Sequence, residues 1–102
     1  MEPIRFLFTR GRQDFVATID VIYDLCLGLW RGCVSLVAVT NGVEYDNTRD
    51  SISSFFIISD DRDVNREVAF DLAVTSFCEY LEDFGLYKEK EKFVTLHKKI
   101  VG

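Results

Sequence analysis

The chain is poor in the residues on which many specialised folds and sites depend. It has one proline, one histidine, three cysteines and six glycines among 102 residues. No stretch approaches the roughly 18 uncharged apolar residues that a membrane-spanning helix needs. The first residues also lack the basic stretch, apolar core and small-residue cleavage site of a secretory signal. We therefore expect one domain over residues 1–102, located in the cytoplasm and not bound to a membrane.

The scarcity of cysteine and histidine argues against metal and redox chemistry. Cys26, Cys33 and Cys78 lie 7 and 45 positions apart, and these separations match neither a zinc knuckle nor a CxxC redox pair. Two of the three fall on apolar stripes, which predicts buried free thiols in a reducing compartment. No serine or cysteine nucleophile lies near His97 in the sequence, so we interpret His97 as a solvent-facing residue on a strand rather than as a general base. Because a glycine-rich phosphate loop is also missing, we expect no enzyme, no catalytic residue, no metal and no cofactor.

Hydrophobic residues make up 48% of the chain, and their spacing predicts the first elements. Residues 4–9 form an apolar strand between Pro3 and the Arg10–Gly11 pair. Over residues 13–31 the apolar positions recur at steps of three and four, which predicts a helix whose buried stripe is Phe15, Ile19, Ile22 and Cys26. Asp20 and Asp24 would then share the opposite, solvated face of that helix.

The middle of the chain is typical of a β-hairpin followed by a buried strand. Residues 33–40 are apolar and rich in β-branched side chains, and the hairpin dipeptide Asn41–Gly42 follows them. Residues 52–59 form a further strand, in which a continuous apolar run indicates burial on both faces. Residues 60–63 are three aspartates and an arginine, and we expect a loop that leads into a helix.

The second predicted helix spans residues 63–84 and has the clearest periodicity in the chain, with one apolar face of Phe70, Val74, Phe77, Leu81 and Phe84. The last segment, residues 92–101, is ambiguous. Its β-branched content favours a strand, and a C-terminal helix is the alternative.

These elements predict an α+β domain with two main helices on one face of an antiparallel sheet. With a final strand the order is β-α-β-β-α-β, the split βαβ or ferredoxin-like arrangement; the alternative replaces that strand by a C-terminal helix. The predicted core is Phe6, Phe8, Phe15, Ile19, Ile22, Cys26, Leu36, Phe55, Ile57, Phe70, Val74, Phe77 and Leu81. The other sheet face is also apolar, so we expect a homodimer through it or cover by residues 41–51.

The net charge of −5 is unevenly distributed along the chain. Residues 1–12 carry +2, residues 13–83 carry −10, and residues 84–102, which hold all five lysines, carry +3. An acidic body of this kind repels the phosphate backbone of extended nucleic acids and suits a basic protein partner.

The predicted helices would gather acids and a short apolar row on one outward surface. Acids around apolar residues are typical of an interface and accelerate the encounter with a basic partner, although such a face is also common as plain solvated surface. The predicted partner-binding residues are Asp20, Asp24, Val68, Asp71, Leu72, Glu79 and Glu82.

In general character, the chain is similar to immunity proteins and phage-encoded inhibitors that block nucleases or defence enzymes. The likeness lies in small size, acidity and the lack of catalytic motifs, with no shared motif behind it. It implies a non-enzymatic protein that neutralises a basic toxin or a nucleic-acid-processing enzyme.

A small-anion or nucleotide site is the alternative function. If residues 92–101 were a strand beside the first strand, four cations would meet at the start of the first helix: Arg10, Arg12, Lys90 and Lys92. Backbone N–H groups of that helix would add hydrogen-bond donors for a phosphate.

Overall fold

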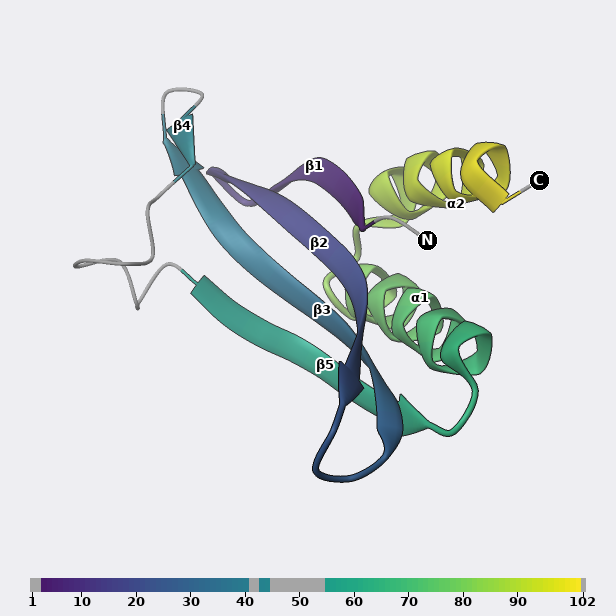
Figure 1. The fold of residues 1–102 in the computed structure, drawn as a ribbon. Helices are drawn as coiled ribbons and strands as arrows, with labels where there is room; N and C mark the ends of the chain where they lie inside the picture. Colours follow the sequence, from purple (N-terminus) through teal and green to yellow (C-terminus); the bar gives the residue numbers. More distant parts are fainter. Residues whose placement is uncertain (1–2, 41–42, 45–54, 102) are drawn as a thin grey trace.

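The protein has an α+β fold, and in its described residues five antiparallel strands precede two helices (Figure 1). The structure, a computed structural model, describes residues 3–40, 43–44 and 55–101. Its elements are β1 (Ile4–Arg10), β2 (Gln13–Asp24), β3 (Leu29–Thr40), β4 (Val43–Glu44), β5 (Phe55–Asp63), α1 (Arg66–Asp83) and α2 (Tyr87–Val101).

The sheet has β1 at one edge, followed by β2 and β3, and β3 pairs with both β5 and the short β4. Both helices lie on one side of it (Figure 1). The predicted α+β class with two helices on one face is therefore confirmed. The described elements follow one another as five strands and then two helices, which differs from the preferred β-α-β-β-α-β order.

Residues 13–31, predicted as a helix, instead form β2, a tight turn and the start of β3. The i and i+4 spacing of Phe15 and Ile19 is also a multiple of two, and Ala17 between them points to the same buried face. The turn ends the strand because the carboxylate of Asp24 accepts the backbone N–H groups of Cys26 and Leu27 at 2.9 and 3.1 Å. Gly28 completes it with a φ of 65°, a conformation that favours glycine.

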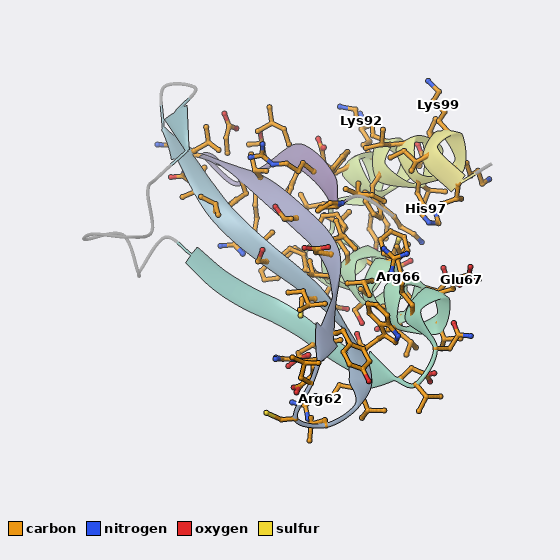
Figure 2. The ribbon with its side chains drawn as sticks, viewed as in Figure 1. Arg62, Arg66, Glu67, Lys92, His97 and Lys99 are labelled. Carbon is orange, nitrogen blue, oxygen red and sulfur yellow. The ribbon has the colours of Figure 1, made fainter. Side chains whose placement is uncertain are left out.

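The C-terminal segment is the helix α2, so the preferred strand over residues 92–101 was wrong and the helical alternative is correct. Phe93 is fully buried, with its ring 4.7 Å from that of Phe77 and 5.4 Å from that of Phe6. Figure 2 shows His97, one turn further on, pointing toward α1. The packing of the α2 face that carries Phe93 and His97 outweighs the intrinsic β propensity of residues 92–101.

The other predicted elements need smaller adjustments. Residues 60–63 are the end of β5 rather than a loop, and α1 begins after Asn65, whose side chain caps the N–H groups of Glu67 and Val68. The α1 bounds otherwise agree with the predicted helix. The predicted hairpin dipeptide Asn41–Gly42 and residues 52–54 of the predicted strand lie outside the described residues. The strand β4, which follows the dipeptide in the chain, pairs antiparallel with β3.

The core lies between the helices and the facing side of the sheet. Nine predicted core residues are buried in one cluster: Phe6, Phe8, Phe15, Ile19, Leu36, Phe70, Val74, Phe77 and Leu81. The prediction of Ile22 and Cys26 as core residues was wrong. Ile22 is 54% exposed and Cys26 is exposed at the β2–β3 turn, because their burial depended on a helix over residues 13–31. The side chains of Phe55 and Ile57 lie outside the described part of the chain.

The opposite sheet face carries the exposed side chains of Leu7 and Ile22. A homodimer through this face stays a prediction, and residues 41–51, the other suggested cover, are described only at 43–44. Among the described residues, no helix has both the length and the apolarity needed to cross a bilayer.

Candidate functional site

The outward face of α1 combines apolar and acidic side chains in one exposed row. Val68 and Leu72 are 41% and 39% exposed and lie one helical turn apart. Asp71 and Glu79 are exposed and share the same side of the helix, since residues three, four and seven positions apart are neighbours on a helix surface. We call these four residues the acidic helix face.

The two acids of this face carry charge that no described residue neutralises through an ion pair. Asp71 and Glu79 form no ion pair or hydrogen bond with any described residue. Glu82, further along α1, is paired with the ammonium group of Lys90. Asp71 and Glu79 therefore carry negative charge beside Val68 and Leu72 without an ion pair to any described residue.

The seven predicted partner-binding residues do not form one surface. Asp20 and Asp24 are on β2, on the sheet face opposite the helices, because residues 13–24 are a strand and not a helix. Asp20 accepts the backbone N–H of Val21 at 2.7 Å, and Asp24 holds the β2–β3 turn. The predicted surface is thus reduced to the part on α1.

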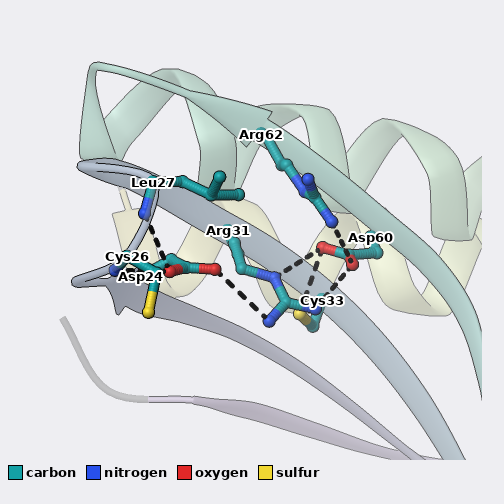
Figure 3. A network of polar contacts seen from close by, with 7 residues as sticks. All are labelled: Asp24, Cys26, Leu27, Arg31, Cys33, Asp60 and Arg62. Atoms are coloured by element: carbon teal, nitrogen blue, oxygen red, sulfur yellow. Dashed lines mark hydrogen bonds and ion pairs between the residues drawn. The ribbon is translucent and has the colours of Figure 1, made fainter.

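A polar network on the open sheet face was missed by sequence reasoning (Figure 3). Arg31 on β3 donates from Nη2 and Nε to the carboxylate of Asp60 on β5, at 2.6 and 3.1 Å. Arg62 lies 3.7 Å from the same carboxylate, and Asp24 lies 3.9 Å from Arg31. The sequence did contain a signal for this network. Asp60 and Arg62 are two positions apart, and residues two apart lie on the same face of a strand.

This pairing changes the protonation of both groups. The hydrogen bond from Arg31 lowers the pKa of Asp60 below its ordinary value of 3.8, and the same bond raises the pKa of Arg31. Asp61, the next residue, points to the helix side and accepts from the hydroxyl of Ser76 at 2.8 Å. Asp60 and Asp61 therefore do not act together as a pair of carboxylate ligands.

The lowered pKa of Asp60 predicts a pH-dependent contribution to stability. It is present above the ordinary aspartate pKa and is lost as the pH falls through the lower pKa of the folded state. We expect Arg31→Gln to reduce the free energy of unfolding at about pH 7 and to have much less effect at about pH 2, measured by urea denaturation. Arg12→Gln, in an exposed turn, is the control and should show no such pH dependence. An equal effect of Arg31→Gln at both pH values would contradict a stabilising ion pair between Arg31 and ionised Asp60.

The four cations of the alternative anion site lie on β1, the β1–β2 turn and α2, and not around the start of a helix over residues 13–31. Arg10 donates to the hydroxyl of Tyr80, and its guanidinium lies 4.8 Å from the ring centre of Phe15 and 4.9 Å from that of Phe84. Arg12 is exposed in the β1–β2 turn, and no helix N-terminus follows it, because residues 13–24 are a strand.

The two lysines of that site lie on α2, where sequence reasoning had placed a strand. Lys90 is paired with Glu82, and Lys92 lies 3.7 Å from Glu89. Each therefore has a carboxylate partner within the helical hairpin.

His97 is not the solvent-facing strand residue that the sequence suggested. It lies on α2, with its ring centre 6.2 Å from that of Phe70 and 6.4 Å from that of Phe93. Its buried Nε2 has no hydrogen-bond partner among the described residues.

All three cysteines are free thiols, and they differ in exposure. Cys26 is exposed, contrary to the prediction, while Cys33 and Cys78 are half-buried. Burial raises the pKa of the Cys33 and Cys78 thiols, which disfavours the reactive thiolate.

Within the described part of the chain, no three His, Cys, Asp or Glu side chains are grouped so that they could hold a metal ion. Comparison with known proteins adds no family: no protein-family model, no curated sequence and no solved structure matches the chain.

Proposed function

We propose that the protein is a non-enzymatic binding protein that docks on a basic surface of another protein through the acidic helix face. The observation that carries this proposal is the position of two exposed apolar side chains, Val68 and Leu72, on the same helix face as Asp71 and Glu79. These two carboxylates form no ion pair with any residue that the structure describes. Burial of the apolar pair would provide affinity, and the carboxylates would accelerate association and orient the partner.

A toxin or a nucleic-acid-processing enzyme is the kind of partner we propose, since such proteins present basic surfaces. Occupation of that surface would inhibit the partner. We further propose a cytoplasmic location, which free thiols support. The anion-binding alternative has less support, because Arg10 and Lys90 are already engaged within the fold.

The proposal is tested by reversing one charge on the acidic helix face. Tagged protein is used to capture partners from a cell lysate at low and high salt, and the association rate is then measured with the purified partner. Glu79→Lys is expected to slow association by about tenfold or more at low salt, with less effect at high salt.

The control is Glu91→Lys on α2, which changes the net charge equally at another exposed position. It should leave the association rate within about twofold of that of the unmodified protein. Equal capture by all three proteins would show that the acidic helix face is ordinary solvated surface. Equal loss in both variants would show that only net charge matters.

A further inference from the structure

We propose a second binding surface, at the free edge of β1, that takes up an extended acidic peptide as an additional strand. Among the described strands, β1 is the terminal one, and its one pairing partner is β2. No other described residue forms a backbone hydrogen bond with it. Its outward N–H and C=O groups can therefore pair with the backbone of an added strand.

The helix α2 flanks this edge. α1 lies mainly against β2, β3 and β5, and α2 lies beside β1 (Figure 1). Phe93 of α2 packs on Phe6 of β1, and Phe77 of α1 reaches the same ring from the inner side. The side of α2 that faces away from α1 is consequently the side that adjoins the free edge of β1.

That side of α2 is rich in lysine. Lys88, Lys92 and Lys99 border one open groove of about 600 Å³, together with Glu91, Thr95 and Leu96. Figure 2 shows Lys92 and Lys99 extending from α2 on the side away from α1, whereas His97 points toward α1. Lys88 and Lys99 form no ion pair with any described residue, so the groove carries an excess of positive charge.

The alternation of β1 itself defines the sequence that fits. Ile4, Phe6 and Phe8 point to the helix side and are buried, and Leu7, 62% exposed, points to the open side. Side chains of an added strand would alternate in the same way. Those on the open side would lie beside Leu7, and those on the helix side would approach the lysines of α2. An extended segment that alternates apolar and acidic residues satisfies both sides.

A second copy of β1 and a nucleic acid fit this edge less well. Two β1 strands pairing edge to edge would bring two lysine rows together, which is repulsive. A nucleic acid could not continue the β-sheet hydrogen bonds of the backbone N–H and C=O groups of β1, whereas an extended peptide can.

The test uses a labelled peptide of seven residues that alternates valine and glutamate, matching the length of β1. Fluorescence anisotropy should show saturable binding that weakens with salt, and the peptide with lysine in place of glutamate should not bind. Peptides N-methylated at alternate residues should distinguish the two edges of the added strand. Methylation on one edge should abolish binding and on the other leave it unchanged, because only one edge pairs with β1.

Charge reversals place the site on the protein. Lys99→Glu is expected to weaken peptide binding by about threefold or more, and Lys92→Glu with Lys99→Glu by about tenfold or more. Lys98→Glu is the matched control, because Lys98 lies beside Lys99 in sequence but does not border the groove, and it should change binding less than about twofold. Hydrogen exchange should also slow at alternate amides of β1 when the peptide is bound.

Several results would overturn the proposal. These are no saturable binding at millimolar peptide, equal binding of both N-methylated peptides, or an equal effect of Lys98→Glu and Lys99→Glu. Tighter binding of a poly(dT) oligonucleotide through the same lysines would assign the surface to nucleic acid instead. Because α1 contributes no residue to this surface, a failure here leaves the acidic helix face untouched, and Glu79→Lys should not alter peptide binding.

Discussion

Replacing Phe77 by alanine is expected to lower the free energy of unfolding by about 3–5 kcal/mol. The ring is fully buried, and its centre lies 4.7 Å from that of Phe93, 5.8 Å from that of Phe8 and 6.1 Å from that of Phe6. Phe77 therefore joins α1 to both β1 and α2. Its removal would cost the transfer of a buried ring and leave a cavity that three elements must share.

The measurement is urea unfolding of the purified variant, followed by circular dichroism. Tyr87→Ala is the control, because this ring is 62% exposed at the start of α2 and should cost less than about 0.5 kcal/mol. A loss below about 1 kcal/mol for Phe77→Ala would contradict the position of α1 in the core.

Replacing Gly32 by alanine is expected to destabilise the protein by about 3 kcal/mol or more, at the upper end for an added core atom. A Cβ at this position would overlap the carbonyl oxygen of Ala69 and lie 2.8 Å from its carbonyl carbon. The obstacle is the backbone of α1 rather than a flexible side chain, so β3 and α1 would have to separate. Gly32 permits the close contact between this helix and the sheet.

The control for this substitution is Ser35→Val on the same strand. Ser35 faces the open side of the sheet, opposite to Gly32, and a β-branched residue suits a strand there. We expect a change within about 0.5 kcal/mol. A tolerated Gly32→Ala, with an unchanged midpoint of urea unfolding, would contradict the close approach of α1 to β3.

Sequence patterns located the elements whose periodicity has only one interpretation. The α1 stripe of Phe70, Val74 and Phe77 matches a helix and no strand, and the helix was correctly placed. The stripe over residues 13–31 did not have this property. Phe15 and Ile19 are four apart, which suits one helical turn or two strand repeats equally, and the turn at Asp24–Gly28 went unrecognised.

The candidate site was predictable to the extent that it lies on one element. Val68, Asp71, Leu72 and Glu79 share a face because they share a helix, and their spacing alone places them together. Asp20 and Asp24 were assigned to the same surface only through the wrong helix. Arg31 and Asp60 are 29 positions apart in the chain, and only the register of β3 against β5 brings them together.

The sequence by itself determined the α+β class, the helix α1, the strand β1, most of the core and the acidic character of the body. These follow from composition and from periodicity within single segments. Only the tertiary structure decided the strand β2, the helix α2, and the separation of the acidic residues onto two sides of the molecule. The physical reason is that short amphipathic segments are nearly balanced between conformations. Contacts from distant parts of the chain, such as Phe93 on Phe6 and Gly32 against Ala69, tip that balance.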